Sequence, residues 1–435
     1  MLATIGYFNI VVFILLGALY FYQAVYVAVV LFSKKKKAQE KVPEFHKYAV
    51  LVAARNESAV IGQLISSVKK QNYPPELVDI YVVADNCTDD TAEISQNAGA
   101  TVYERFNRTE VGKGYALDYV LGRIEQEHAD EGYEGYFVFD ADNLLDPNYI
   151  REMNRLFDQG YRVVTSYRNS KNYGSNWISA GYSLWFLRES KYLNNARMLL
   201  GTSCAISGTG FLMHKDIVRK NNGWKHHLLT EDIEFSVDSV LQGEKIGYCG
   251  SAKLYDEQPC TWSQSWKQRL RWSKGFYQVC WHYGTRLLKG IFTGRSFAHY
   301  DMFMTVMPAL FISLGSIGVN LLFLLFGLSS TKVAAVLVPL ALRAIFMGFV
   351  NYYLILFSFG VLTTITEWRE IHCRPVKKLL YTFTFPIFIF SYIPISIEAL
   401  FRRIEWTPIT HTIGTTIEEV HGASWAPSRE GRRTA

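Results

Sequence analysis

Cysteine is scarce in this chain of 435 residues, and its spacing excludes two common classes of protein. The six cysteines show neither the paired spacing of a zinc site nor the framework of a disulfide-rich secreted domain. We therefore expect reduced, mostly structural thiols in a cytoplasmic setting. No internal repeat or low-complexity segment stands out, which excludes a repeat array. The cysteines are Cys87, Cys204, Cys249, Cys260, Cys280 and Cys373.

A strong excess of one charge is also absent. The formal net charge is +6, and much of the basic excess lies in Lys34–Lys37 and around Lys267–Lys274. Contacts with membrane and phosphate explain these clusters, so no nucleic-acid partner is expected. For the lysine run, a solvated basic face is the alternative.

Charged residues are missing altogether from Ile5 to Phe32. That segment is long enough to cross a bilayer of roughly 30 Å. Lys34–Lys37 follow at once, and the tendency of basic residues to remain in the cytoplasm puts the N-terminus outside. A cleaved signal peptide would have its basic residues before a shorter apolar core. We therefore expect a retained membrane anchor.

The pattern changes from Tyr48, where short β-branched runs alternate with helical stretches. Alternation of this kind predicts right-handed crossovers and an α/β fold with a mostly parallel sheet, covered by helices on both faces. Ligands of such sheets bind beyond the carboxyl ends of the strands. The expected strands are Tyr48–Ala53, Asp79–Ala84 and Tyr136–Phe139, and the expected helices are Ala59–Gln71, Thr91–Ala98 and Ala116–Glu127.

Polar residues follow three of the expected strands. Asp140 and Asp142 are two carboxylates at a strand end, and they can hold Mg²⁺ or Mn²⁺ against phosphate oxygens. A turn rich in Asp and Asn is the alternative. Glu57, Asp85 and Lys113 are candidates for contacts with a nucleotide: Asp85 can accept the imide N–H of uracil, and Lys113 can meet phosphate or base oxygens. An exposed cation in a glycine turn is the alternative for Lys113.

Thr230-Glu231-Asp232 precedes an amphipathic helix. Thr230 or Asp232 could be its N-cap. A carboxylate here can also be a general base that takes a proton from an acceptor hydroxyl. The two roles are compatible, because a cap lies at a helix mouth that faces the ligand edge of the sheet. Upstream, Gly208-Thr209-Gly210 either allows close backbone approach or is a plain tight turn.

The stretch Trp262–Gly290 predicts an amphipathic helix in the membrane interface, or two helices broken near Gly275. A helix facing the core of the soluble domain is the alternative. Arg269 and Arg271 suit a diphosphate, and Trp272 offers a flat face to a sugar. Basic residues beside tryptophan are also ordinary interface anchors.

Residues 301–328, 332–365 and 379–400 are apolar enough to cross a membrane. If each of these three stretches crosses once after the N-terminal anchor, the tail lies outside, whereas Arg402 and Arg403 indicate that it lies inside. The middle stretch could instead be two short crossings, or one crossing plus an interfacial piece. Arg343 lies in it, and either lines a polar path or snorkels to the interface. The expected organisation is an anchor at 1–33, an α/β domain at 45–260, interface helices at 261–295, three or four spans at 300–400 and a tail at 401–435.

Taken in order, these motifs resemble those of the membrane-embedded processive synthases of glycosyltransferase family 2, which include cellulose, chitin and hyaluronan synthases. The resemblance covers about residues 45–290 and implies a GT-A type nucleotide-sugar-binding domain that uses a UDP-sugar and a divalent metal. It rests on Ala54-Arg55-Asn56-Glu57, Asp85, Gly112-Lys113, Asp140-Ala141-Asp142, Gly208-Thr209-Gly210, Thr230-Glu231-Asp232 and Gln268-Arg269-Leu270-Arg271-Trp272.

The resemblance also implies roles for these residues. Asp140 and Asp142 would serve the nucleotide diphosphate and the Mg²⁺ or Mn²⁺ ion, and Asp232 would deprotonate the acceptor, so that an α-linked donor gives a β-linked product. Trp272 would stack under the acceptor sugar at the mouth of a transmembrane channel. The nucleotide-sugar set is completed by Ala54, Glu57, Asp85, Lys113, Arg269 and Arg271, and the acceptor set by Gly208, Thr209, Gly210 and Glu231.

The chain departs from its larger relatives in two respects. No cyclic-dinucleotide-binding domain follows the membrane region, and the Phe-x-Val-Thr-x-Lys gating segment of cellulose synthases is absent. The aromatic and polar cluster Glu405–His411 follows the last expected span. We hypothesise that it does a similar job if the tail is cytoplasmic.

The function expected from these features is that of a processive inverting synthase. It would be a multi-pass protein of the plasma membrane with a cytoplasmic catalytic domain, would polymerise a UDP-sugar, and would export the growing polysaccharide through its own helices. UDP-glucose and a β-glucan are favoured, with UDP-N-acetylglucosamine next. The alternatives are a non-processive transferase that acts on a lipid, and a transporter or receptor with a nucleotide-binding module.

Overall fold

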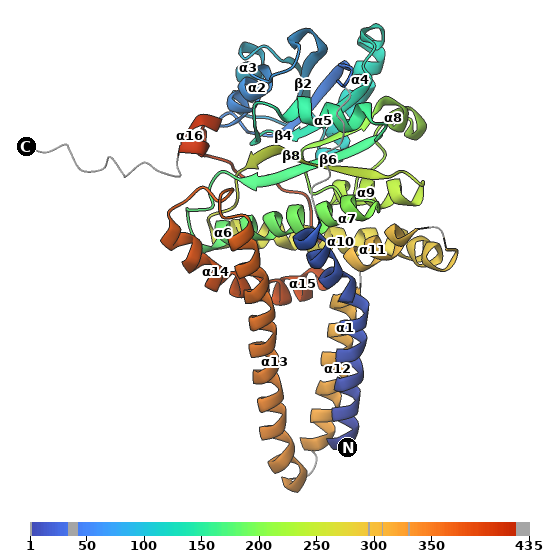
Figure 1. Ribbon diagram of the computed structural model, residues 1–435, viewed down its shortest axis with the longest axis vertical. Coiled ribbons are helices and arrows are strands. Elements are labelled where there is room, and N and C mark those ends of the chain that lie inside the picture. Colours follow the sequence, from blue (N-terminus) through green and yellow to red (C-terminus); the bar gives the residue numbers. More distant parts are fainter. Residues whose placement is uncertain (1, 34–41, 295, 307, 329–330, 423–435) are drawn as a thin grey trace, which may run out of the picture.

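A computed structural model of the chain describes residues 2–33, 42–294, 296–306, 308–328 and 331–422. The lysine run Lys34–Lys37 and the last part of the tail lie outside the described residues. Figure 1 shows an α/β domain at one end of the molecule and long helices that extend from the other end.

The domain is built on one mixed sheet. Its strands are β1 (Tyr48–Ala54), β2 (Val78–Asp85), β3 (Thr101–Arg105), β4 (Gly135–Asp140), β5 (Leu144–Leu145), β6 (Val163–Ser170), β7 (Phe211–His214) and β8 (Ile246–Asp256). They lie in the order β3-β2-β1-β4-β7-β6-β8-β5. The three predicted strands are confirmed as β1, β2 and β4. Among the described strand pairs four are parallel and three antiparallel, and the antiparallel pairs all lie beyond β4.

Helices cover both faces of the sheet, as expected. Ala49 and Leu51 of β1 face one hydrophobic cluster, and Tyr48, Val50 and Val52 face another. Alternate residues of a strand point to opposite faces, so a strand buried on both sides must be apolar throughout. The helices of the domain are α2 (Ile61–Lys69), α3 (Thr91–Asn97), α4 (Lys113–Glu127), α5 (Tyr149–Asp158), α6 (Trp177–Arg188), α7 (Asn195–Leu200), α8 (Lys215–Asn221) and α9 (Glu231–Leu241).

Helix α10 (Trp262–Phe292) is continuous, which decides between the two predicted forms in favour of one helix without a break near Gly275. A Cβ atom at Gly275 would lie 2.5 Å from side-chain atoms of Thr230. The glycine therefore allows α10 to approach the domain closely. The helix packs on α9 of the domain and on α11 (Phe297–Val306) and α15 (Tyr392–Phe401). It therefore faces the domain on one side and α11 and α15 on the other, and its position in a membrane interface stays a prediction.

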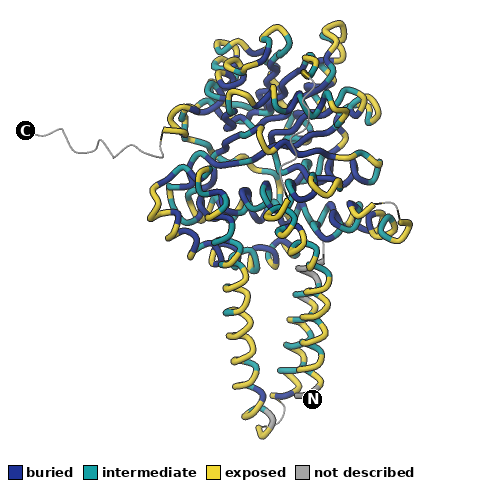
Figure 2. The backbone as a smooth tube through the Cα atoms, viewed as in Figure 1, coloured by how far each residue is buried: buried dark blue, intermediate teal, exposed yellow. Residues whose placement is uncertain are grey.

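Three long helices extend away from the domain: α1 (Leu2–Phe32), α12 (Pro308–Leu328) and α13 (Thr331–Thr366). Helix α1 lies beside α12, and Asn9 and Asn320 exchange hydrogen bonds of 2.9 and 2.8 Å between them. Helix α13 stands apart from this pair over most of its length (Figure 1). Figure 2 shows that these helices are largely exposed, in contrast to the domain.

Three of the four expected spans correspond to helices of sufficient length with altered limits, and the span expected at 301–328 does not. Three helices are long and apolar enough to cross a membrane, at Thr4–Phe32, Ala334–Thr366 and Pro375–Phe401, and Gly315–Leu328 is a shorter apolar helix. The stretch 332–365 forms one helix, with Arg343 exposed on it. Asp301 does not begin a span, because it lies in α11 and is fully buried against Arg197, 2.7 Å away.

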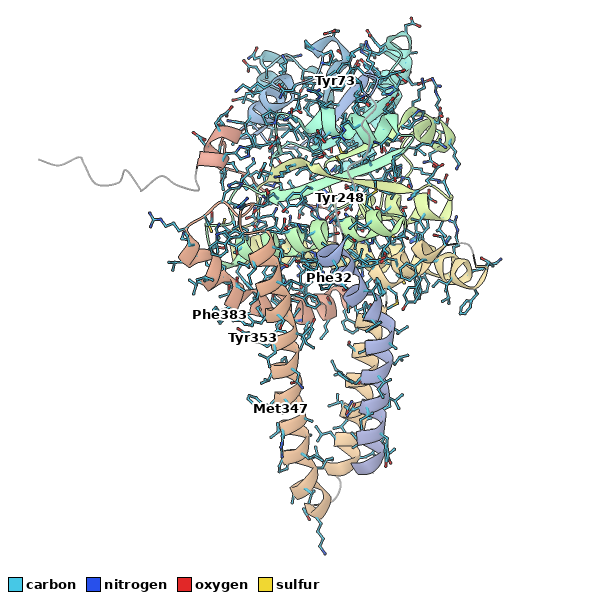
Figure 3. All side chains as sticks on the ribbon, in the orientation of Figure 1. Phe32, Tyr73, Tyr248, Met347, Tyr353 and Phe383 are labelled. Atoms are coloured by element: carbon cyan, nitrogen blue, oxygen red, sulfur yellow. The ribbon has the colours of Figure 1, made fainter. Side chains whose placement is uncertain are left out.

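The third candidate span differs from the others in orientation. It consists of α14 (Pro375–Phe390) and α15, which lie across the base of the domain in Figure 1. They pack on α6 and α10. Its most apolar window is 39% buried, against 6% for the other two candidates. Figure 3 places Phe383 of α14 near Tyr353 of α13, whose hydroxyl donates to the Phe383 carbonyl at 2.9 Å.

Candidate active site

The polar residues expected to bind a donor meet at the carboxyl edge of the parallel strands. Ala53 of β1 is in register with Asp140 of β4, and Ala54 with Ala84 of β2. Directly beyond these strands, Asn56 and Asn86 adopt left-handed backbone conformations, with φ of 57° and 55°. Asparagine tolerates this conformation better than most residues. These turns carry the chain across the edge where the site forms.

Lys113 and Gly208 connect the two halves of the predicted site. The buried ammonium of Lys113 donates to the carboxylate of Asp140 and to the carbonyl oxygen of Gly208, the latter at 2.8 Å. The N–H of Gly208 donates to Oδ2 of Asp232 at 2.6 Å. One glycine therefore holds the expected base next to the lysine of the expected donor site. Burial disfavours the charged form of Lys113 and tends to lower its pKa. The negative charges of Asp140 and Glu231 outweigh this effect, so that the pKa of Lys113 is raised.

Glu231 and Asp232 lie in the first turn of α9, as the cap motif predicted. Burial raises the pKa of Asp232, opposed by backbone N–H groups of Gly208 and Ile233. Burial also raises the pKa of Glu231, to about 7. Thr230 occupies the N-cap position, but its side chain makes no capping hydrogen bond. Burial therefore strengthens both carboxylates as bases, which suits acid–base chemistry.

The segment Gly208-Thr209-Gly210 supports Asp140 and Asn143 through hydrogen bonds of Thr209. The Thr209 hydroxyl accepts the Asp140 N–H at 2.8 Å and donates to Oδ1 of Asn143 at 2.6 Å. Gly210 has a φ of 66°, and a Cβ there would lie 1.9 Å from a Leu254 methyl group. Thr209 is buried and Gly210 is enclosed. Only Gly208 of the predicted acceptor triplet contacts Asp232.

Asp142 is buried, and both of its carboxylate oxygens accept hydrogen bonds. Oδ2 accepts the Glu257 N–H at 2.7 Å, and Oδ1 accepts the Asn143 amide at 3.2 Å. Burial tends to raise the pKa of Asp142, but the charges of His411 and Lys171 outweigh it and lower the pKa. Asp142 therefore remains an anion.

Asp140 is the more open of the two predicted metal ligands. Its side chain is 35% exposed, and Lys113 contacts only its Oδ1. Within the described residues, no three His, Cys, Asp or Glu side chains gather into a complete metal site. The two aspartates fit a hard cation whose remaining ligands are phosphate oxygens and water, as is usual for Mg²⁺ at nucleotide sites.

Asp85 has a partner that the sequence did not indicate. Its Oδ1 accepts from Arg105, its register neighbour on β3, at 2.7 Å. Both side chains are buried. The Oδ2 atom makes no hydrogen bond within the described part of the chain. It could therefore accept the imide N–H that the nucleotide prediction assigns to Asp85.

Arg271 and Arg269 lie on opposite faces of α10. Arg271 is half-buried near acidic groups: loss of solvent lowers its pKa, against the opposing charges of Glu231, Asp140 and Asp232. Its Nε atom has no hydrogen-bond partner in the described structure. Arg269 is 0% exposed and donates instead to the Phe388 carbonyl at 3.1 Å and to Ser391. The structure thus brings Arg271, and not Arg269, to the carboxylates.

Trp272 and Gln268 have different surroundings: Trp272 packs against aromatic rings, whereas Gln268 lines a cavity. Trp272 is partly buried and packs edge-on against Tyr182 and Phe186, with ring centroids 5.7 and 6.1 Å away. Gln268 and Arg271 line a cavity of about 490 Å³ between α10 and the tail. A cavity of this size can enclose a sugar or part of a nucleotide.

The tail segment Glu405–His411 crosses the open side of the site. The Trp406 ring lies 5.4 Å from the guanidinium carbon of Arg55 and 5.8 Å from that of Arg271. The His411 ring nitrogen Nδ1 is 3.0 Å from the Glu57 carboxylate. Burial raises the pKa of Glu57 to about 7. Burial would lower the pKa of His411, but Asp142 and Glu57 raise it to about 10.

Several site residues were missed by the sequence analysis. Arg168 at the end of β6 pairs with Asp256 at 2.5 Å and donates to the Ser207 carbonyl at 2.8 Å. Glu257 accepts the backbone N–H groups of Thr412 and Ile413, the latter at 2.8 Å. Both follow the same rule as Asp140, that of polar residues ending a strand. The pattern of a polar residue at a strand end was therefore present in the sequence. It was not recognised because strands β6 and β8 were not predicted.

Comparisons with known proteins agree with this geometry. A family model described as glycosyltransferase like family 2 matches residues 45–275. The beta-monoglucosyldiacylglycerol synthase of Synechocystis sp. is 26% identical over 53% of this chain and 47% of its own length. The poly-beta-1,6-N-acetyl-D-glucosamine synthase of Staphylococcus aureus is 28% identical over 61% of this chain and 62% of its own length. The chain thus spans about half to three fifths of these relatives.

A solved structure shares the fold. The mannosyltransferase PcManGT of Pyrobaculum calidifontis, determined with GDP-Man and Mn²⁺, superposes with a TM-score of 0.54 over 90% of this chain and 98% of its own. The sequence identity is 13%, so the likeness concerns the fold. The sheet described above is accordingly of the GT-A type.

Proposed function

The chain belongs to the glycosyltransferase like family 2, and from this premise we propose that it transfers a sugar from a UDP-sugar to a membrane-borne hydroxyl acceptor, with inversion at the anomeric carbon. The observation that carries the proposal is the position of Gly208, which binds Lys113 through its carbonyl and Asp232 through its N–H. This arrangement supports a general base, Asp232, on one side of the anomeric carbon of the donor sugar, and a donor-binding lysine, Lys113, on the other.

The donor side is assigned to residues at the strand ends. Asp85 would accept the uracil imide, and Lys113 and Arg271 would contact the diphosphate. Asp140 and Asp142 would hold Mg²⁺ or Mn²⁺, which when bound neutralises charge on the leaving diphosphate. The buried, unpartnered Nε of Arg271 supports this assignment, because a guanidinium stabilises a diphosphate best where water is excluded.

The acceptor side centres on Asp232. Its carboxylate takes the proton of the acceptor hydroxyl as the hydroxyl oxygen forms a bond to the anomeric carbon. The bond from that carbon to the diphosphate breaks, and UDP leaves with the electron pair. Attack opposite the leaving group converts an α-linked donor to a β-linked product. The raised pKa of Asp232 supports this role, since a stronger base accepts a proton more readily.

A lipid is the acceptor that the geometry supports best. Helix α13 stands apart from α1 and α12 (Figure 1), and only 6% of the most apolar window of α1 and of α13 is buried. Helices that enclosed a polysaccharide channel would bury their facing sides against one another or a chain. A lipid in the bilayer plane can reach the base of the domain without such a channel.

Processive synthesis is the second candidate, with UDP-glucose giving a β-glucan favoured and UDP-N-acetylglucosamine next. The partly buried ring of Trp272, which directly follows Arg271 in α10, favours it, because aromatic faces bind sugars. In either case we propose a multi-pass protein of the plasma membrane with a cytoplasmic catalytic domain.

The proposal is tested with purified full-length protein in lipid, supplied with single UDP-sugars and Mg²⁺ or Mn²⁺. We expect UDP release with one donor, and expect Asp232→Asn to lower it by about 10²–10⁴-fold while UDP binding is retained. A product that extracts into organic solvent supports a lipid acceptor, whereas one cut by linkage-specific glycan hydrolases supports polymer synthesis. Absence of UDP release with every donor would contradict the proposal.

A further inference from the structure

Arg188 lies where the domain meets the space between α1 and α13. It is the last residue of α6, and its guanidinium donates to Oε1 of Gln23 on α1 at 2.8 Å. On the other side, its guanidinium carbon is 5.2 Å from the Phe359 ring of α13 and 5.3 Å from the Trp185 ring. One arginine thus contacts both of the helices that stand apart in Figure 1.

The charge of Arg188 is not neutralised by an ion pair. In the described structure no carboxylate lies within 4.0 Å of its guanidinium nitrogens, and Gln23 is uncharged. Burial lowers the pKa of Arg188, opposed by the charge of Glu189. Glu189 accepts from the Ser207 hydroxyl at 3.1 Å instead, and burial raises its pKa. A half-buried guanidinium with one neutral partner has donors left for an anion.

The surroundings determine what kind of anion can reach this guanidinium. Exposed apolar side chains run along α13 below Phe359, among them Leu354 and Ile355, and Phe21 is exposed on α1. These surfaces suit hydrocarbon. Arg188 can bind an anion, and the surface directly beneath it can bind hydrocarbon. Together they suit a phosphate group attached to a hydrocarbon tail.

Arg188 is also connected to the reacting centre. Its neighbour Glu189 binds Ser207, and the next residue, Gly208, donates its N–H to Asp232. The positive charge of Arg168 acts on both Glu189 and Asp232, and in each case it opposes the rise in pKa that burial causes. Arg188 is therefore linked to the proposed base through Glu189, Ser207 and Gly208.

We propose that Arg188 and Gln23 bind the phosphate of a phospholipid between α1 and α13, and that a hydroxyl of its headgroup is the sugar acceptor. This rests on the proposed lipid acceptor and narrows it from any lipid to a phosphate-bearing one. The headgroup hydroxyl gives its proton to Asp232, its oxygen bonds to the anomeric carbon, and UDP departs with the electron pair.

The test measures lipid binding without a donor sugar. Full-length protein in dodecyl maltoside, which contains no phosphate, is titrated with dioleoyl phosphatidylglycerol or with dioleoylglycerol, which has a hydroxyl but no phosphate. We expect about tenfold tighter binding of the phospholipid, the effect of one charge-assisted hydrogen bond. Arg188→Ala should abolish the preference. Equal binding of the two lipids by the wild type, or an unchanged preference in the variant, overturns the proposal.

Arg286→Ala is the matched control, because Arg286 of α10 is exposed and also lies over a ring, that of Tyr283. It should keep the preference. Binding of UDP checks the fold of each variant, and Arg188→Gln replaces Arg188→Ala if the latter fails to bind UDP. Inorganic phosphate that displaced the phospholipid at equal concentration would overturn the lipid assignment.

A second readout separates this inference from the proposed function. With the productive donor, radiolabelled sugar should enter phosphatidylglycerol, and Arg188→Ala should reduce that incorporation about tenfold. Label that enters dioleoylglycerol equally well overturns the phosphate requirement and leaves the transferase intact. Phospholipid preference without UDP release from any donor contradicts the proposed function alone.

Discussion

Arg269 and Arg271 have different surroundings because of their positions on one helix. Successive residues of an α-helix are about 100° apart, so residues two apart point to nearly opposite sides. Arg271 therefore faces the acidic site, whereas Arg269 lies among the rings of Tyr182, Phe388 and Tyr392. The first is placed to act on a ligand, and the second to join α10 to the helices at the base.

The two arginines give a paired prediction. We expect Arg271→Ala to lower kcat/KM by about 10²-fold or more, the cost of removing one donor to a leaving group, with little change in melting temperature. Arg269→Ala should instead destabilise the fold by about 2–4 kcal/mol, because it opens a cavity and removes the hydrogen bonds that Arg269 donates to the Phe388 carbonyl and to Ser391. Steady-state kinetics and thermal unfolding of both variants check this. The reverse pattern would contradict the site assignment.

At the scale of elements, the tail is the most informative segment. It runs from the base of the domain to its upper part: Gln264 binds the Thr410 carbonyl at 2.9 Å, and α16 (Ile417–Gly422) packs by Ile417 and Val420 against Leu144 and Tyr255. Ile404 also packs against Leu270 at the base, and between it and α16 both Trp406 and His411 lie over the site. Anchoring at both ends holds the intervening segment across the opening.

Replacing residues 405–411 with a glycine–serine linker of equal length tests the importance of this cover. We expect UDP binding to weaken and turnover to fall by about tenfold or more, because closure excludes water from the diphosphate. Truncation after Gly414, which removes α16 but keeps Trp406 and His411, is the control and should have a smaller effect. Full activity of the linker variant would remove the hypothesis that Glu405–His411 gates the site.

At the scale of the whole molecule, the arrangement of the helices leads to a proposal for the side that the tail occupies. We propose that α1, α12 and α13, which stand upright in Figure 1, each cross the membrane, and that α14 and α15 lie across the base without crossing it. The tail then returns to the side of the catalytic domain, where His411 meets Glu57. This agrees with the orientation that Arg402 and Arg403 indicate.

Epitope tags test this topology. A tag at the N-terminus, and one inserted between α12 and α13, should be labelled on intact cells by a membrane-impermeant reagent. A C-terminal tag should be labelled only after permeabilisation. Labelling of the C-terminal tag on intact cells would mean that α14 and α15 cross the membrane, and would contradict three crossings.

Part of this organisation follows from local pattern alone. The apolar runs of β1, β2 and β4 predicted their strands, and topology rules placed Asp85, Asp140 and Glu57 at one edge. The amphipathic spacing predicted α10, and the lack of charge predicted α1. These inferences succeed because hydrophobic period and strand-end chemistry depend on residues that are near in sequence.

What the sequence by itself determined is therefore the identity of part of the elements, among them β1, β2, β4, α1 and α10, and the edge of the sheet where the polar residues gather. Tertiary structure alone decided that Arg271 and not Arg269 reaches the carboxylates, that Arg105 pairs with Asp85, that α14 and α15 lie against the domain, and that His411 meets Glu57. Each of these depends on which surfaces pack together across a long separation in sequence. Hydropathy and spacing do not encode that choice, because an apolar helix can bury its surface equally in lipid or against a protein face.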